Sequence, residues 1–212
     1  MGRQPNESET ERTLIHRGGM LNARVYRAAG AYGAAWIEKD FSACPRLVRN
    51  TVGRFLVWRE CWILRRLERR TAVVPDGVRR LGPFALREDF CEGDTLRACR
   101  QRRETPPRAF FEALEEGVKA AHAARFVHLD LHNSRNVMVG PGWRPVLIDW
   151  QSALPTFWMP GLLRRALERI DLAGVYKFWD KFRPGELSPD RRKLLERSRF
   201  LRRHFWIPRL RA

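Results

Sequence analysis

The chain has 212 residues, enough for one compact unit or two small lobes, and its hydrophobic content of 44% supports a buried core. Its formal net charge of +17 favours anionic partners. Because the start is polar and no apolar run is long enough to cross a bilayer, we expect neither a secretory signal nor a transmembrane helix.

The first part of the chain combines a polar start, glycines and strand-forming residues. Residues 1–12 are expected to form a flexible tail. Gly18 and Gly19 follow it and precede a β-rich stretch that includes Val25. The glycine-rich residues 30–33 are then expected to make a turn between two strands.

The strand predicted at residues 36–39 ends at an unusual lysine. The chain has 41 Lys and Arg residues, but Lys39 is the only lysine among the first 118 residues. Lysine and arginine are not interchangeable around a phosphate, so a compact ammonium at this position indicates a specific role. A solvated lysine at the end of a strand is the alternative.

A helix is predicted next, because apolar residues recur at helical spacing between residues 52 and 67. Glu60 lies on the apolar stripe, and a buried carboxylate needs a counter-charge. Lys39 is the first candidate, whereas Arg59 or Arg65 would let Glu60 reach solvent instead. The stripe is formed by Val52, Phe55, Leu56, Ile63, Leu64 and Leu67.

Residues 83–90 are predicted to be the last strand of the β-rich part, and residues 92–96 continue from it. A second helix is predicted from about residue 107 to residue 124. Its inward face consists of Phe110, Phe111, Leu114, Val118 and Ala121.

This helix leads to a polar loop and two short β-rich runs. The loop is His128-Leu129-Asp130-Leu131-His132-Asn133-Ser134-Arg135-Asn136. Residues 137–139 and 146–148 follow, with Gly140-Pro141-Gly142 between them and Asp149 after the second run. The glycine turn predicts that the two runs form a hairpin.

The loop and the hairpin contain the residue types that phosphoryl transfer needs. One carboxylate must orient the attacking hydroxyl and accept its proton, while a second carboxylate and an amide oxygen hold magnesium against the phosphates. Asp130, Asp149 and Asn136 fit these three roles. Their order and spacing resemble the catalytic loop and the metal-binding Asp of the protein-kinase-like superfamily.

The loop departs from the superfamily pattern H-x-D-x-x-x-x-N by one position. Residue 135 is Arg, and the nearest amide is Asn136. We prefer Asn136, with one extra residue in the loop, and recruitment of Asn133 is the alternative. His132 matches the H-x-D-x-H pattern of sugar, antibiotic and choline kinases, where a cationic group would steady the transferring phosphoryl.

The resemblance implies a two-lobed α+β fold with ATP and Mg²⁺ as cofactors. A small β-rich, nucleotide-binding N-lobe is expected over residues 13–90 and a truncated, mainly helical, catalytic C-lobe over residues 91–190. In the phosphate loop only Gly18 matches a glycine position of the family pattern, and the adenine is expected to contact mainly main chain. The implied nucleotide-binding residues are Gly18, Gly19, Val25, Lys39, Glu60, Glu88 and Phe90.

The end of the chain narrows the resemblance to small atypical kinases. Asp149-Trp150-Gln151 stands where eukaryotic kinases have Asp-Phe-Gly, and the 63 residues that follow leave no room for both an activation segment and a peptide platform. The chain is closer to RIO-like kinases and to bacterial lipopolysaccharide-core kinases, including those acting on the sugar Kdo. Residues 168–178 resemble a short helix of the latter group, in which Asp171 would brace the catalytic loop.

The last segment, residues 191–212, is basic and amphipathic. It contains nine Arg or Lys residues against one Glu, with aromatic residues between them. This pattern favours contact with an anionic membrane surface or another polyanion, and a helix packed on the C-lobe is the alternative. Its apolar residues are Phe200, Leu201, Phe205, Trp206, Ile207 and Leu210.

From these features we predict an ATP-dependent kinase acting on a hydroxyl, first of an anionic lipopolysaccharide-core saccharide and alternatively of a protein serine or threonine. A pseudokinase scaffold and a basic nucleic-acid-binding module are further alternatives, although zinc-finger, KH and RRM patterns are missing from the sequence. The expected location is cytoplasmic, with peripheral contact to the inner face of the membrane. The cysteines lack C-x-x-C spacing, so reduced thiols are expected rather than a zinc site.

Overall fold

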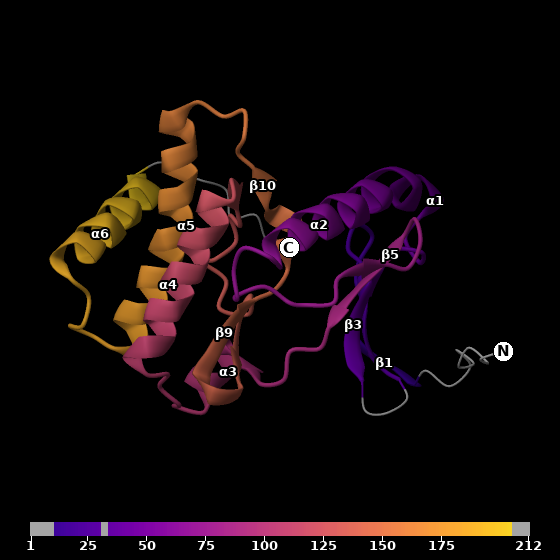
Figure 1. Ribbon diagram of the computed structural model, residues 1–212, viewed down its shortest axis with the longest axis horizontal. Coiled ribbons are helices and arrows are strands. Elements are labelled where there is room, and N and C mark those ends of the chain that lie inside the picture. The colour runs from indigo at the N-terminus through magenta and orange to yellow at the C-terminus, as the bar shows by residue number, and fades with distance from the viewer. Residues whose placement is uncertain (1–10, 31–33, 205–212) are drawn as a thin grey trace. The chain divides into compact units, whose positions relative to one another are not determined.

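The computed structural model describes residues 11–30 and 34–204, and the chain divides into two units (Figure 1). The first unit contains the described residues up to Arg69 together with Val74–Glu92. The second unit contains Arg70–Val73 and the chain from Gly93 onward. The architecture is α+β, with a β-rich first unit and a mainly helical second unit.

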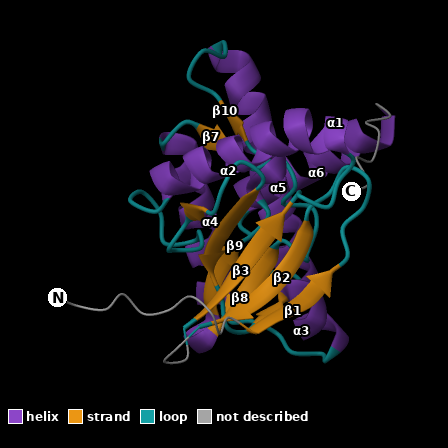
Figure 2. Cartoon of the chain, turned by 90° about the vertical axis from the view of Figure 1, so that its right-hand side faces the viewer, coloured by secondary structure: helices purple, strands orange, loops and turns teal. Residues whose placement is uncertain are grey.

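The first unit is built on a five-stranded antiparallel sheet of order β1-β2-β3-β5-β4, and Figure 2 shows β1, β2 and β3 side by side. The predicted strand at 36–39 is confirmed in β3. The predicted tail ends too late, because Glu11 and Arg12 already pair with β2, while residues 1–10 lie outside the described residues. The strands are β1 (Glu11–His16), β2 (Arg24–Ala29), β3 (Ala35–Asp40), β4 (Arg79–Arg80) and β5 (Ala85–Asp89).

The predicted helix over 52–67 is also present, and it begins irregularly. A short α1 (Arg46–Val48) and a π-helical turn, η2 (Arg49–Gly53), lead into α2 (Arg54–Leu67). Gly53 allows the close approach of the chain to Phe41, since a Cβ at this position would lie 3.0 Å from the Cβ of Phe41. The core beside α2 contains Ala23, Phe41, Cys44, Val57 and Leu86.

Two residues of the predicted apolar stripe are in fact exposed. Val52 belongs to the π-helical turn, which changes the phase of the helix, and 42% of its surface is accessible. Phe55 is 52% exposed because it lies about 140° around the helix from the buried Glu60. The prediction was wrong for these two positions, and α2 therefore presents apolar side chains to solvent.

The second unit combines helices with two small sheets. The predicted hairpin is confirmed, because β8 pairs antiparallel with β9 and Gly142 adopts a φ of 67° in the turn. The predicted helix over 107–124 is confirmed as α4, and its predicted inward residues are buried. The elements are β6 (Asp94–Thr95), α3 (Leu96–Gln101), α4 (Arg108–Ala123), β7 (Phe126–Val127), β8 (Val137–Gly140), η3 (Pro141–Trp143), β9 (Arg144–Leu147), η4 (Trp150–Ser152), β10 (Leu154–Pro155), α5 (Gly161–Phe182) and α6 (Pro189–His204).

A buried carboxylate joins three helices of this unit. Glu115 of α4 accepts a hydrogen bond of 2.8 Å from the hydroxyl of Tyr176 in α5 and pairs at 2.9 Å with Arg191 of α6. Burial alone would raise its pKa, but hydrogen bonds from Lys119 and Tyr176 hold the pKa of Glu115 below its usual range. The ionised carboxylate of Glu115 therefore stabilises the packing of α6 against α4 and α5.

The basic C-terminal segment accordingly begins as a packed helix. Leu195 of α6 is only 3% exposed, and the Arg191 guanidinium lies 4.7 Å from the ring centroid of Trp179. Arg199 pairs with Asp180 of α5 at 3.0 Å. The packed alternative thus describes the first part of this segment, whereas Phe205, Trp206, Ile207 and Leu210 lie outside the described residues.

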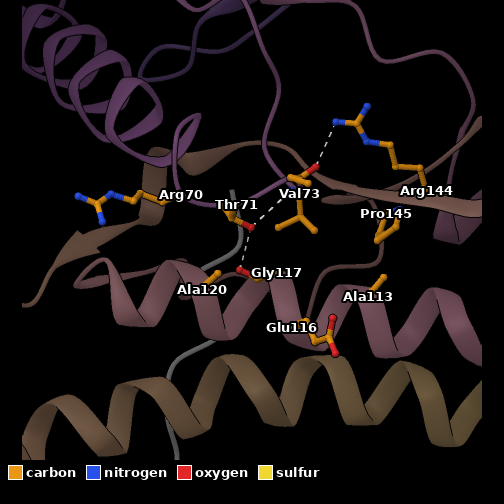
Figure 3. Close-up of a pocket in the computed structure, with 10 residues that line it drawn as sticks. Arg70, Thr71, Val73, Ala113, Glu116, Gly117, Ala120, Arg144 and Pro145 are labelled. Atoms are coloured by element: carbon orange, nitrogen blue, oxygen red, sulfur yellow. Dashed lines mark hydrogen bonds between the residues drawn. The ribbon is translucent and has the colours of Figure 1, made fainter.

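The segment 70–73, which follows α2 in the chain, belongs to the second unit and is hydrogen-bonded to α4 and β9 (Figure 3). The hydroxyl of Thr71 donates to the Gly117 carbonyl at 3.1 Å, and the main-chain N–H of Leu147 donates to the Val73 carbonyl at 2.6 Å. A Cβ at residue 117 would lie 2.2 Å from Val73 Cγ1, so glycine permits this contact. A cavity of about 350 Å³ lies alongside, lined by Arg70–Val73, Ala113, Glu116, Gly117, Ala120, Arg144 and Pro145, none of them a predicted site residue.

Candidate active site

The loop at residues 128–136 runs from β7 to β8 and is organised around Asn136. Asn136 is buried, and its Nδ2 donates to Asp130 Oδ2 at 2.7 Å and to the Asp130 carbonyl at 3.2 Å. The Asn136 carbonyl accepts from the Ile148 N–H at 3.0 Å. The loop therefore places the Asn136 amide against the Asp130 carboxylate and ties both to the end of β9.

Asn133 occupies a different environment, although the sequence left it open as an alternative. Its side chain is exposed, and its Oδ1 accepts from the main-chain N–H of Arg135 at 3.1 Å. This local bond forms an Asx turn, which uses the amide oxygen that a metal would need. The geometry thus supports Asn136 as the metal-facing amide, and the assignment stays a prediction.

His128 connects the start of the loop to the residues before Asp149. It is buried, its Nε2 lies 3.2 Å from the Ile148 carbonyl, and its Nδ1 lies 3.3 Å from the Asp130 N–H. The carbonyl accepts and the N–H donates, so the ring carries its proton on Nε2 and is neutral. Desolvation lowers the pKa of His128 from its ordinary value, which agrees with a neutral ring.

Asp149 follows β9 by two residues and has left-handed backbone angles, with φ at 62° and ψ at 68°. Trp150, immediately after it, is buried, donates from Nε1 to the Leu147 carbonyl at 3.0 Å, and packs its ring 4.6 Å from that of His128. The backbone at Asp149 is thus held in a sparsely populated conformation by its neighbours. Asp149 as a whole is half-buried.

Three residues of α5, spaced three apart in the sequence, contact the loop at residues 128–136. Asp171 accepts from the N–H groups of His128 and Leu129 at 2.7 and 2.8 Å, which confirms the predicted bracing. Gly174 allows close approach, since a Cβ there would lie 2.6 Å from the Leu131 carbonyl oxygen.

Lys177 completes this row with a hydrogen bond of 2.6 Å from Nζ to the His132 carbonyl. Sequence reasoning found Asp171 but missed Gly174 and Lys177, although the helical spacing from Asp171 could have indicated both. His132 itself is half-buried, and both of its ring nitrogens are shielded from solvent. Its predicted contact with the phosphoryl group stays a prediction.

In the first unit, the predicted ion pair between Lys39 and Glu60 is present. Lys39 Nζ of β3 lies 2.5 Å from Glu60 Oε1 of α2, and both side chains are buried. Glu88 of β5 adds a second buried carboxylate, with its Oε1 at 3.6 Å from Lys39 Nζ. One ammonium thus lies between two carboxylates, an arrangement the sequence did not reveal.

Some of the groups expected to contact adenine at Glu88 and Phe90 already have partners within the protein. The Glu88 side chain points to Lys39, and the N–H groups of Asp89 and Phe90 donate to the carbonyls of Asp76 and Ala35 at 2.8 and 3.1 Å. A base at this edge would therefore use main-chain groups other than these two donors. The nucleotide roles of Glu88 and Phe90 stay predictions.

The predicted phosphate loop lies between β1 and β2. Gly18 has a φ of 67°, and a Cβ there would lie 2.6 Å from the Asn22 carbonyl oxygen, so the turn requires glycine. Gly19 exchanges main-chain hydrogen bonds with Asn22 at 3.3 and 3.4 Å. Val25 on β2 is directly opposite Lys39 in the sheet, which brings the end of this loop next to the lysine.

A metal at the loop would rely on few protein ligands. Among the described residues, no group of three or more His, Cys, Asp or Glu side chains could hold a metal ion. Asp149 and Asn136 together offer one carboxylate and one amide oxygen, which suits Mg²⁺ because this ion usually takes few protein ligands and completes its shell with water and phosphate. The donor set therefore fits the expected ion.

A β-rich unit with a buried Lys–Glu pair, followed by a helical unit with this loop and hairpin, defines a protein-kinase-like fold. The sequence matches the RIO domain over residues 34–190, so the chain belongs to the RIO family of that superfamily. Members of this family are kinases, and their domains use ATP with a divalent metal. A comparison with curated proteins finds no match to the chain.

Proposed function

We propose that the protein transfers the γ-phosphoryl group of ATP to a hydroxyl group with Mg²⁺ as the metal. The observation that carries this proposal is the hydrogen bond of 2.7 Å between Asn136 Nδ2 and Asp130 Oδ2, in a loop whose Asn136 carbonyl accepts from the N–H of Ile148, the residue before Asp149. It joins a candidate base and a candidate metal ligand in one loop. The RIO family membership supports the same reaction class.

Asp130 is the residue that orients the acceptor. Its Oδ2 accepts from Asn136, and its Oδ1 would accept the proton of the attacking hydroxyl. Asn136 Oδ1 and the Asp149 carboxylate would hold the metal, since Asn136 Nδ2 is used by Asp130. ATP with Mg²⁺ supplies the phosphoryl group and neutralises its charge.

The first unit would bind the nucleotide. Lys39, held by Glu60 and Glu88, would contact phosphate oxygens, and the main chain of the Gly18–Gly19 turn would lie near them. Val25 and the main chain near Phe90 would contact the adenosine part. These roles follow from the family resemblance and from the positions of the residues in the sheet.

Family membership changes the order of the proposed acceptors. The RIO domain supports a protein serine or threonine hydroxyl, which was the alternative from the sequence. The lipopolysaccharide-core saccharide, predicted first, is not supported by any comparison and becomes the second candidate, resting on the net charge of +17. Within residues 11–30 and 34–204, no helix has the length and apolar composition needed to cross a membrane.

Labelled ATP and Mg²⁺, with and without a soluble protein fraction or a cell-envelope extract, would test the activity and separate the acceptors. Asp149→Asn should weaken Mg²⁺-dependent nucleotide binding. Asp130→Asn should leave that binding nearly intact and lower turnover by about 10²-fold or more. Wild-type transfer by Asp130→Asn would remove that residue from the mechanism, and binding without any transfer by the wild-type protein would indicate a pseudokinase.

A further inference from the structure

The outward side of α1, η2 and α2 carries a row of apolar side chains, all within the first unit. Leu47, Val52, Phe55 and Trp58 are exposed by 77%, 42%, 52% and 49%, and Trp62 is half-buried. Single exposed apolar residues are ordinary, but several of them on consecutive helical segments, three of them with neighbouring rings, indicate an interaction surface. We call these five residues the apolar row.

The segment that carries the apolar row is strongly basic. Residues 46–69 contain seven arginines and two glutamates. Both glutamates are engaged within the first unit, since Glu60 pairs with Lys39 and Glu68 accepts from the Val78 N–H at 2.9 Å. The exposed face of this segment therefore carries positive charge.

Helix geometry places the arginines along both edges of the apolar row. With about 100° per residue, Arg54 and Arg65 lie to one side of the ridge formed by Trp58 and Trp62, and Arg66 lies to the other. Arg54, Arg65, Arg66 and the following Arg69 are exposed. The face is thus an apolar stripe with basic borders.

The aromatic rings of the row lie against one another and against guanidinium groups. The ring centroids of Phe55 and Trp58 are 6.1 Å apart, and those of Trp58 and Trp62 are 6.2 Å apart with an interplanar angle of 19°. The Arg59 guanidinium lies 5.3 Å from the Phe55 centroid, and that of Arg66 lies 4.5 Å from the Trp62 centroid. Phe55, Trp58 and Trp62 therefore form one connected aromatic surface with guanidinium groups beside it.

We propose that this face docks on an anionic membrane surface, with α2 lying in the plane of the interface. An apolar stripe of Trp, Phe and Leu bordered by basic residues is the pattern of interfacial helices, and anionic headgroups attract the arginines. Leu47 and Val52 add exposed aliphatic groups on the segments just before α2, and aliphatic groups insert among lipids but offer a nucleic-acid base no ring to stack on. Exposed rings beside arginines can also stack on bases, so nucleic-acid binding is the competing outcome of the test.

Co-sedimentation of the full-length protein with vesicles tests the proposal. One set contains phosphatidylglycerol and phosphatidylcholine in equal parts, and the other contains phosphatidylcholine alone. Phe55→Ser/Trp58→Ser should lower binding to the anionic vesicles at least about tenfold, because it removes apolar area from the contact. Trp158→Ser is the matched control, since Trp158 is 71% exposed in the second unit, and it should bind like the wild type.

A second variant covers the case in which the aromatic substitutions prevent folding. Arg54→Gln/Arg69→Gln keeps the apolar row and should weaken binding at low salt but little at high salt. Unchanged binding by the variants that fold, or equal wild-type binding to both vesicle sets, would overturn the proposal. Binding of the same variants to oligouridylate is measured in parallel. If they lose oligouridylate binding but keep vesicle binding, the proposal is overturned and the surface is assigned to nucleic acid. The assay contains no ATP, so its result is independent of the proposed kinase activity.

Discussion

The predicted metal site in the loop depends on which of two asparagines, Asn133 or Asn136, faces the metal. Sequence spacing alone left Asn133 and Asn136 open, because the loop departs from the superfamily pattern by one residue. The two side chains differ in the structure, since Asn136 is buried against Asp130 and Asn133 is exposed in an Asx turn. A loop that carries an extra residue can thus still place one amide next to Asp130, the candidate base.

Substitution of the two amides tests this assignment directly. Asn136→Ala should raise the Mg²⁺ concentration needed for transfer and lower turnover, because it removes both a metal ligand and the donor to Asp130. Asn133→Ala is the matched control and should change activity little. Titration of Mg²⁺ in a transfer assay measures both effects, and the reverse ranking would show that Asn133 is the ligand.

His128 makes the stability of the second unit dependent on pH. Desolvation lowers its pKa in the folded protein below the ordinary value of 6.5, so the unfolded chain takes up the proton first. The contribution of the neutral ring is complete above pH 6.5 and is lost as the pH falls below it. Stability should therefore decline on acidification before the carboxylates titrate.

Urea unfolding between about pH 8 and pH 5 measures this dependence. His128→Gln should be less stable than the wild type at the upper end but should show a shallower decline below pH 6.5. His16→Gln, at an exposed position of β1, should reproduce the wild-type slope. An unchanged slope in His128→Gln would mean that another group causes the decline.

At the level of elements, the sequence pattern predicted individual helices and strands better than it predicted the contacts between them. The strand at Lys39, the hairpin before Asp149 and helix α4 were predictable because each has a local signal of alternation, turn residues or helical spacing. The exposure of Val52 was not, because a π-helical turn has no marker in the pattern, whereas Phe55 is exposed because it lies about 140° around α2 from the buried Glu60. Glu88 likewise meets Lys39 only once β5 pairs with β3.

Helix α5 supports the candidate catalytic loop, and Gly174 allows the two to approach closely. Gly174→Ala would place a Cβ 2.6 Å from the Leu131 carbonyl oxygen, and backbone cannot move aside as a flexible side chain does. We expect a loss of about 1–3 kcal/mol in stability and a fall in kcat with nearly unchanged nucleotide affinity.

The control for this substitution lies on the same helix. Gly161 begins α5, and a Cβ there would meet nothing within 4 Å, so Gly161→Ala should retain wild-type stability and kcat. Thermal unfolding and steady-state kinetics at saturating ATP compare the two variants. An unchanged kcat in a folded Gly174→Ala protein would show that α5 does not control the loop through this contact.

At the scale of the whole molecule, charge is distributed unevenly. Of the net charge of +17, a large share comes from residues 191–212, which carry nine Arg or Lys residues against one Glu. Part of this charge stabilises the fold, because Arg191 forms an ion pair with Glu115 and lies over the ring of Trp179. Composition could not separate arginines that stabilise the fold from those that face a partner.

Deleting residues 198–212 tests what the remaining charge does. The deletion removes five arginines and no acidic residue, while it keeps Arg191 and the buried Leu195. It also removes the exposed pair between Arg199 and Asp180, which is worth about 1 kcal/mol at most. The truncated protein should therefore fold, bind nucleotide like the full chain and lose part of its binding to anionic vesicles.

Salt dependence distinguishes this electrostatic contribution from a structural one. Each basic residue near an anionic surface contributes about 1 kcal/mol before screening, so raising the salt concentration should weaken vesicle binding of the full chain more than that of the truncated chain. Combining the deletion with Phe55→Ser/Trp58→Ser should give additive losses if the two surfaces bind independently. Unfolding on truncation, or vesicle binding equal to that of the full chain, would assign the C-terminal segment to the fold and leave α2 as the membrane-facing surface.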